Sequence, residues 1–215
     1  MTIRVLLADD HRVMRAGLRS LIDKEEDMEV VAQADNGRRA VELARECCPD
    51  VVMMDIGMRE LNGIDATRQI TATSGNIKVL ALSMHGDEQF VAQMLAAGAS
   101  GYLLKDCAFD ELSQAIRAVV ADQNYLSPSI SRILIQDHVG RLSGDDLSDA
   151  SALDNREREI LQLLAEGKTS RQIASCLRMS VRTIETRRRE IMAKLNLHSV
   201  AGLTKYAVRK GLTHL

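Results

Sequence analysis

The chain of 215 residues lacks any apolar run long enough to cross a membrane, and it lacks a cysteine spacing typical of a metal site. A membrane-spanning helix needs roughly 18 or more apolar residues in succession. The N-terminal MTIRVLLADD has too short an apolar run for a secretory signal, and it ends in acids instead of a small-residue cleavage site. The four cysteines show no CxxC spacing, so we interpret them as reduced packing residues of a cytoplasmic protein, with a metal or redox role as the alternative.

A phosphate-binding loop is also absent. GKT at 167–169 has the last three letters of the P-loop motif, but that motif needs glycine at position 162, which is Gln162. We therefore exclude a P-loop nucleotide site.

The net charge of −2 conceals an uneven distribution. Residues 1–120 carry 13 Lys and Arg against 19 Asp and Glu (−6), residues 121–152 carry 2 against 5 (−3), and residues 153–215 carry 13 against 6 (+7). A basic part behind an acidic one predicts that the basic part binds a polyanion. With 46% hydrophobic and 27% charged residues, the chain can form one large or two modest globular domains.

Residues 1–121 alternate short apolar runs with amphipathic stretches. The runs cover 3–8, 29–34, 51–55, 78–83 and 101–104, and helical patterns lie near 12–23, 37–47, 64–73, 87–97 and 110–120. Five strands that alternate with five helices predict a doubly wound α/β domain around a five-stranded parallel sheet. Pro49, Gly98 and a predicted loop at Asn62-Gly63 separate these elements.

Residues 122–152 are predicted to be a linker that is helical in part. Ser127-Pro128 precedes a helix expected over 130–139, and GRLSGDDLSDAS at 140–151 lacks periodicity. Residues 153–215 are predicted to be an all-α domain of four helices, near 155–166, 170–177, 181–195 and 199–210.

The turn between the second and third of these helices has the three-residue length of a helix-turn-helix. Ser180, the last residue of that turn, is expected to cap the third helix. The helix ends are predicted from two capping boxes and two glycine stops: Asp154 with Glu157, Thr169 with Gln172, Gly167 and Gly211.

Charged and polar residues follow the predicted strands. They are Asp9 and Asp10 after the first, Asp55 at the end of the third, Ser83 at the end of the fourth and Lys105 after the fifth. Ligands of open parallel sheets bind beyond the carboxyl ends of the strands. Three carboxylates there would repel one another, and Mg²⁺ with oxygen ligands removes that conflict. Such a site favours attack of a carboxylate on a phosphoryl group, although each acid alone could merely cap a helix.

The motifs that hold these residues resemble a known family. ADDH, MMDIGM, ALSMH and GYLLKD are similar to the receiver domain of bacterial two-component response regulators, which has a flavodoxin-like fold, over residues 3–120. The resemblance implies that Asp55 is the phosphoacceptor for the phosphohistidine of a sensor histidine kinase. The domain would promote only its own phosphoryl transfer and slow dephosphorylation, and it would not be an enzyme.

The same resemblance implies roles for the neighbouring residues. Asp10 and Asp55, with the Gly57 carbonyl, would hold Mg²⁺, and Asp9 would act through water. Ser83 and Tyr102 would form a switch pair, with Lys105 stabilising the phosphoryl group. The bare sequence alone, without the resemblance, favours Tyr102 as a packing residue of the core or surface.

Arg59 departs from the family pattern. The family usually has proline at this position, and arginine releases the loop backbone that proline would fix. Arg59 is either a solvated surface residue or a neighbour of the phosphoryl oxygens. The lifetime of the phosphorylated state is therefore open.

Residues 153–215 resemble the LuxR-type helix-turn-helix domain, and the whole chain resembles a NarL/FixJ-type response regulator. Helical periodicity places Val181, Ile184, Ile191 and Leu195 on an inward face of the third helix. Arg182, Thr186, Arg189 and Ala193 fall on the opposite face, with Glu185 on its flank. TRRRE alone would be a solvated charged face. The turn and the apolar reverse face favour DNA binding instead.

Side chains on that polar face could read the major groove of double-stranded DNA, arginine at guanine and glutamate at cytosine. The resemblance nominates Glu185, Thr186 and Arg189 as base-reading residues. For the DNA backbone it nominates Thr169, Ser170, Arg182, Arg187, Arg188 and Lys194.

The sequence thus predicts a cytoplasmic transcription regulator that is switched by phosphorylation of Asp55. The expected partners are the sensor kinase, DNA, a second copy of the chain in the phosphorylated state through the 199–210 helix, and RNA polymerase; no membrane is expected. One alternative is a DNA-binding regulator whose receiver responds to a partner or ligand without phosphorylation, for which Arg59 is the only support. A flavin protein or aspartyl-phosphate hydrolase is disfavoured, because Asp9-Asp10 would repel a flavin phosphate and Gly57 stands where the hydrolase needs an acid.

Overall fold

The computed structural model describes residues 2–84, 88–107, 109–132 and 153–213. They form two compact units, an α/β unit before residue 133 and a helical unit from residue 153 onward. No helix in these described ranges is long and apolar enough to cross a membrane.

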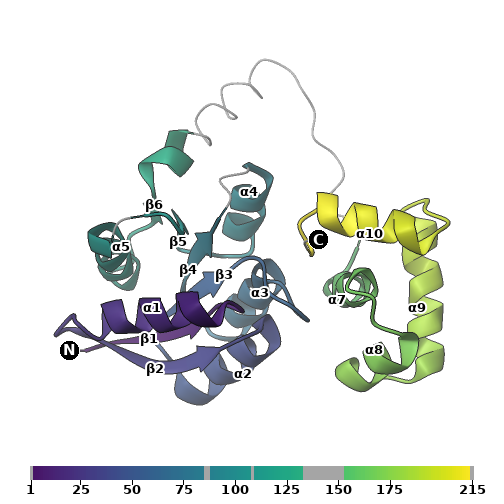
Figure 1. The fold of residues 1–215 in the computed structure, drawn as a ribbon, viewed down its shortest axis with the longest axis horizontal. Helices are drawn as coiled ribbons and strands as arrows, with labels where there is room; N and C mark the ends of the chain where they lie inside the picture. The colour runs from purple at the N-terminus through teal and green to yellow at the C-terminus, as the bar shows by residue number, and fades with distance from the viewer. Residues whose placement is uncertain (1, 85–87, 108, 133–152, 214–215) are drawn as a thin grey trace. The chain divides into compact units, whose positions relative to one another are not determined.

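A six-stranded parallel sheet forms the centre of the first unit (Figure 1). Its strands, in spatial order, are β2 (Met28–Ala34), β1 (Ile3–Ala8), β3 (Val51–Asp55), β4 (Lys78–Ser83), β5 (Gly101–Leu104) and β6 (Tyr125–Leu126). The first five strands along the chain lie within one residue of the predicted ranges, which confirms the parallel α/β prediction. The strand order reverses at β1 and β3, so their carboxyl ends form the point where open α/β sheets bind ligands.

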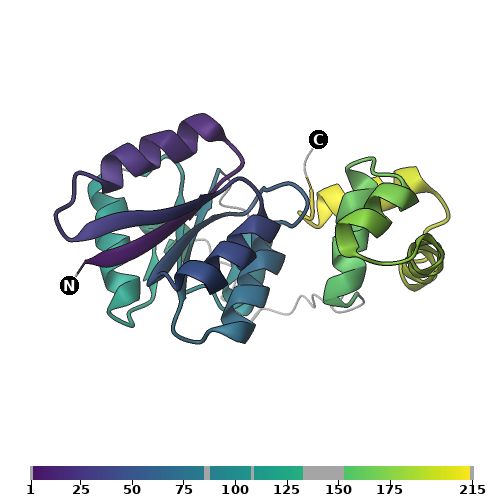
Figure 2. The same cartoon turned by 90° about the horizontal axis from the view of Figure 1, so that it is seen from below.

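Helices cover both faces of the sheet (Figure 2). One face carries α1 (Arg12–Ile22) and α5 (Phe109–Val120). The other carries α2 (Gly37–Cys47), α3 (Gly63–Thr73) and α4 (Glu88–Ala96). Each of these helices begins and ends within one residue of its predicted range.

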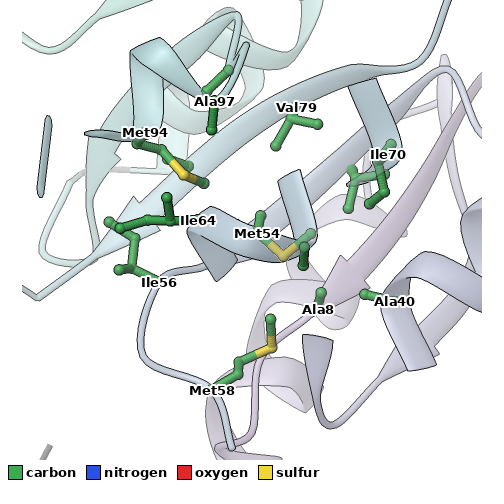
Figure 3. Packing of buried hydrophobic residues seen from close by; sticks show 14 of the residues in the cluster. Ala8, Ala40, Met54, Ile56, Met58, Ile64, Ile70, Val79, Met94 and Ala97 are labelled. Carbon is green, nitrogen blue, oxygen red and sulfur yellow. The ribbon is translucent and has the colours of Figure 1, made fainter. Parts of the chain in front are cut away.

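Strand β3 contributes to the core on both faces. Val51 and Met53 pack beneath α1 and α5, whereas Val52 and Met54 pack beneath α2, α3 and α4, because side chains alternate along a strand. Figure 3 shows Met54 among other buried side chains of the core beneath α2, α3 and α4. All five residues of β3 are buried, which accounts for the unbroken apolar run that precedes Asp55.

The short strand β6 lies in the segment predicted to be a linker. Tyr125 pairs with Gly101, and Leu126 pairs with Tyr102. The Ser127 N–H donates to the Tyr102 carbonyl at 3.1 Å. The first residues after α5 therefore belong to the sheet.

A helical turn follows β6. It begins at Pro128 and is described as far as residue 132. Ile130 in this turn is fully buried in the core beneath α2, α3 and α4. The remainder of the helix predicted over 130–139, and the whole of 140–151, lie outside the described residues.

The second unit has the four predicted helices: α7 (Asn155–Ala165), α8 (Ser170–Leu177), α9 (Val181–Lys194) and α10 (Val200–Arg209). Both predicted capping boxes are present, at the starts of α7 and α8, and Ser180 caps α9 by accepting the Thr183 N–H. Gly167 has a φ of 79°, which suits glycine after a helix end. The predictions of the helix ends are confirmed.

The inward face of α9 is shorter than predicted. Ile184 and Ile191 are fully buried, and Leu195 packs against the same core. Val181 is 42% exposed, so the prediction that it packs inward was wrong. Val181 is the first residue of α9 and lies about 60° around the helix from Ile184, at the edge of the buried stripe. The predicted outward residues are all exposed: Arg182, Thr186, Arg189 and Ala193.

Candidate functional site

Three carboxylates and an imidazole meet at the carboxyl ends of β1 and β3. One ligand atom from each of Asp9, Asp10, His11 and Asp55 lies within 4.8 Å of the others. His11 Nδ1 lies 3.2 Å from Asp9 Oδ1 and 2.9 Å from Asp10 Oδ1. The structure therefore brings together the three acids that the sequence placed at this edge. His11 was missed, although it is the fourth letter of the ADDH motif.

Lys105 forms ion pairs with two of these acids. Its Nζ lies 2.8 Å from Asp9 Oδ2 and 2.8 Å from Asp55 Oδ2. The Asp9 residue is 1% exposed and Asp55 is 4% exposed. Burying an isolated carboxylate is strongly unfavourable, so the two short ion pairs offset the desolvation of both acids.

Burial and charge shift the proton affinities in this cluster. Burial raises the pKa of Asp55, Asp9 acts in the same direction, and Lys105 opposes them without cancelling the rise. Burial lowers the pKa of Lys105, but the charges of Asp55 and Asp9 outweigh it and raise that pKa above its ordinary value. Lys105 thus stays charged, and Asp55 is a more basic carboxylate than one in water.

The loop after β3 returns close to Asp55. Asn62 caps α3 by accepting the Asp65 N–H at 2.9 Å, and Gly63, which was predicted to lie in a loop, is the first residue of α3. A Cβ atom at Gly63 would lie 2.0 Å from the Asp55 carbonyl oxygen. Only glycine therefore permits α3 to start this close to the end of β3.

Ser83 and Tyr102 lie on the neighbouring strands β4 and β5. Ser83 ends β4 and is 4% exposed, and its carbonyl accepts the Lys105 N–H at 2.8 Å. Ser83 is therefore at the same edge of the sheet as Asp55. Tyr102 is three residues before Lys105 and is fully buried in the core.

Gly57 and Arg59 lie in the loop that leaves β3. The Gly57 N–H donates to Asp55 Oδ1 at 3.3 Å. The Arg59 side chain is 85% exposed, yet its Nε lies 3.8 Å from Asp10 Oδ2. The structure thus places Arg59 beside the acidic cluster.

In the helical unit, α8 and α9 present a polar surface. The Ser170 hydroxyl on α8 donates to the carboxylate of Glu185 on α9. The Arg189 Nε donates to the Glu185 carbonyl at 3.3 Å. Glu185 is half-buried, while Thr186 and Arg189 are exposed. The side chain of Glu185 is therefore held in place from the preceding helix.

The residues nominated for DNA-backbone contact have different surroundings. Thr169 caps α8, Arg182 is exposed and Arg188 is half-buried. Arg187 Nη1 lies 3.4 Å from Glu190 Oε2, and Lys194 forms an ion pair with Glu157 of α7. The charges of Arg187 and Lys194 are thus partly offset within the unit.

Known families match both units. Residues 5–117 match the response regulator receiver domain, and residues 151–207 match the bacterial regulatory proteins of the luxR family. The chain belongs to the NarL/FixJ family of two-component response regulators.

Relatives of this response regulator match it over nearly the full length. The oxygen regulatory protein NreC of Staphylococcus epidermidis (strain ATCC 12228) is 37% identical over 215 residues, which cover 98% of this chain and 99% of that protein. The transcriptional regulatory protein DegU of Brevibacillus brevis is 34% identical over 223 residues, which cover 97% of this chain and 94% of that protein. A crystal structure of a LuxR-family two-component response regulator from Aurantimonas sp. SI85-9A1 has a TM-score of 0.62 at 38% identity, and covers 65% of this chain and 99% of that one.

Membership of this family assigns the general function. The protein is a two-component response regulator with a LuxR-type DNA-binding domain, and it is not a conventional enzyme. A kinase and DNA are its partners. The cluster of Asp9, Asp10 and Asp55 is typical of the magnesium site of receiver domains.

Proposed function

We propose that Asp55 is the phosphoryl acceptor of this response regulator and that a sensor histidine kinase is the donor. The observation that carries the proposal is the position of Asp55, at the end of a buried strand, 2.8 Å from Lys105 and within 4.8 Å of Asp9 and Asp10. Burial raises the pKa of Asp55, which makes its carboxylate a better nucleophile.

In the transfer step, an oxygen of Asp55 forms a bond to phosphorus while the bond from phosphorus to the donor imidazole nitrogen breaks. The electron pair of that bond leaves with the imidazole, which takes up a proton. The Lys105 ammonium is already paired with Asp55, so it offsets the negative charge of the aspartyl phosphate. Ser83, at the same sheet edge, would donate its hydroxyl to a phosphoryl oxygen, and Tyr102 would be its switch partner.

The residues at the site fit a magnesium ion. Asp10, Asp55 and the Gly57 carbonyl would hold Mg²⁺, and Asp9 would act through water. Three clustered carboxylates supply the oxygen ligands that hard cations prefer, and the ion would relieve their mutual repulsion. When bound, Mg²⁺ would neutralise charge on the phosphoryl oxygens.

For the helical unit, we propose that α9 enters the major groove of DNA. Its exposed polar face supports this, with Glu185, Thr186 and Arg189 as base-reading residues. The backbone contacts would come from Thr169, Ser170, Arg182, Arg187, Arg188 and Lys194.

The proposed output is a change of assembly. Phosphorylation would favour a homodimer on two DNA half-sites, with α10 as the dimer surface, and the dimer would act with RNA polymerase in the cytoplasm. In this proposal the receiver domain spans 1–121, the linker 122–152, whose first residues supply β6 to the receiver sheet, and the DNA-binding domain 153–215.

Phosphorylation is tested by incubating the full chain with acetyl phosphate and Mg²⁺ and measuring the mass increase of one phosphate. We expect Asp55→Asn to abolish the increase, and EDTA to abolish it in the unchanged chain. Asp35→Asn is a matched control, because Asp35 is an exposed acid directly after β2. Undiminished labelling of Asp55→Asn would move the acceptor elsewhere.

The same assay separates the alternative function. If the unchanged chain takes up no phosphate from acetyl phosphate or from a kinase, control by a partner or ligand without phosphorylation replaces the proposal. DNA reading is tested by binding-site sequencing: Arg189→Ala should relax the base preference, and an unchanged preference would remove Arg189 from the base readers.

A further inference from the structure

We propose that Arg59 weakens the binding of a divalent cation to the unphosphorylated site, because its guanidinium already occupies the solvent side of Asp10. This inference rests on the proposed Mg²⁺ site. Arg59 would act as a positioning residue, through Asp10.

Both oxygens of Asp10 face basic nitrogens. His11 Nδ1 lies 2.9 Å from Oδ1, and Arg59 Nε lies 3.8 Å from Oδ2. The Asp10 side chain is 14% exposed and that of Arg59 is 85% exposed. The guanidinium therefore approaches Asp10 from the solvent, the direction from which a cation must arrive.

The backbone on either side of Arg59 is anchored. Met58, directly before Arg59, is 2% exposed, and Leu61, two residues after it, is 1% exposed, so both are packed in the core. The Leu61 N–H donates to the Arg59 carbonyl at 2.7 Å. A short loop held at both ends keeps the side chain of Arg59 near the site, although no proline fixes its backbone.

Charge balance gives the direction of the effect. Three carboxylates and the cations of Lys105 and Arg59 sum to a charge of −1, counted without His11. Without Arg59 the same site would carry −2. A divalent cation is attracted more strongly to the site without Arg59, because that site is more negative. The cation is then also free of repulsion by a guanidinium.

Phosphorylation would change this balance. A phosphoryl group adds roughly 1.5–2 negative charges, which outweigh the single charge of Arg59, and a guanidinium pairs readily with phosphoryl oxygens. Arg59 therefore makes tight cation binding more dependent on the phosphoryl group than it would be with a neutral residue at this position.

The test measures the apparent Kd for Mn²⁺ and Mg²⁺ of the full chain by electron paramagnetic resonance competition, at pH 8. We expect Arg59→Gln to bind both ions about two- to fivefold more tightly at low salt, the size expected from an exposed ion pair. Arg59→Lys, which keeps the positive charge, should have the same Kd as the unchanged chain. The difference in Kd between Arg59→Gln and the unchanged chain should shrink near 1 M salt, where the screening length is about 3 Å. It should also shrink when beryllofluoride is bound to Asp55.

Two controls make the outcome specific. Arg19→Gln changes the net charge equally but lies in the last turn of α1, where Arg19 pairs with Asp23, and it should leave the Kd unchanged. Asp10→Asn should lose cation binding; if it binds as the unchanged chain does, the proposed magnesium site fails. If Asp10→Asn loses binding but Arg59→Gln binds no more tightly than the unchanged chain, the role of Arg59 is overturned and the site stands.

Discussion

The ammonium group of Lys194, at the end of α9, lies 2.6 Å from Oε1 of Glu157 in the first turn of α7. The Glu157 side chain is fully buried, and its other oxygen accepts the Asp154 N–H at 2.9 Å as part of the capping box. Arg187 lies 3.9 Å from the same carboxylate. One buried acid therefore joins the start of α7 to the basic helix.

We expect Lys194→Met to destabilise the helical unit by about 1–3 kcal/mol, because Glu157 would keep a buried charge without its closest partner, with only Arg187 left at 3.9 Å. The value lies below that of a fully buried pair, since the Lys194 side chain is 45% exposed. Urea unfolding followed by circular dichroism measures it, and Arg182→Met on the exposed face is the control. Lys194 is also a proposed phosphate contact, so the salt dependence of DNA binding should weaken as well; unchanged stability would contradict the role of its ion pair with Glu157.

Ser170→Ala is expected to change base preference, because the Ser170 hydroxyl holds the Glu185 carboxylate. A lost hydrogen bond of about 1 kcal/mol corresponds to a roughly fivefold weaker discrimination at the base pairs that Glu185 reads. Selection of binding sites from a random pool measures the preference. Ser175→Ala, at an exposed position of α8, is the control. Ser170 is also a proposed contact of the DNA backbone. Because its hydroxyl is uncharged, an unchanged preference with weaker binding to all sequences would show that it contacts phosphate and does not position Glu185.

Gly63→Ala should destabilise the receiver by about 2–4 kcal/mol, because the new methyl group would overlap the Asp55 carbonyl. Phosphate uptake at Asp55 should fall with it, since the end of β3 must shift. Gly17→Ala is the matched control: nothing lies within 4 Å of its Cβ position, and alanine in α1 should stabilise by about 0.5–1 kcal/mol. Equal thermal stability of the two variants would contradict the close approach of α3 to Asp55.

Arg117→Gln should lower the Tm more at pH 7 than at pH 3. The Arg117 guanidinium hydrogen-bonds both oxygens of Asp27 and lowers the pKa of that carboxyl. A depressed pKa in the folded state contributes stability above the ordinary carboxyl pKa, and that stability is lost as the pH falls through the folded value. Calorimetry at both pH values and at two salt concentrations measures the difference. An equal loss of Tm at both pH values would show that Arg117 acts by packing alone.

The position of the acidic cluster was predictable from chain order. Asp9 and Asp55 each come directly after a short apolar run, and the carboxyl ends of parallel strands meet at one edge. The runs are continuous because the sheet is covered on both faces, and this pattern survives in the sequence.

Other features depend on tertiary contacts that a sequence does not display. The two-residue strand β6 is too short for a periodic pattern and exists because β5 offers it a pairing edge. In the sequence, Lys194 cannot be distinguished from other lysines of a basic helix. Its contact with Glu157 exists only because α7 packs against α9. His11 joins the acidic cluster only because its ring turns toward Asp10, which is a matter of side-chain conformation.

The pairing of β6 with β5 also determines where the receiver can be divided from the rest of the chain. A fragment that ends at residue 121 would lose the partner strand of Gly101 and Tyr102 and would remove Ile130 from the core. Its uncovered edge would offer unpaired backbone groups to a second copy. Such a fragment could associate through the exposed edge of β5, whereas one that ends at residue 132 keeps β5 paired with β6. Self-association of the shorter fragment would therefore be a consequence of the truncation and not of phosphorylation.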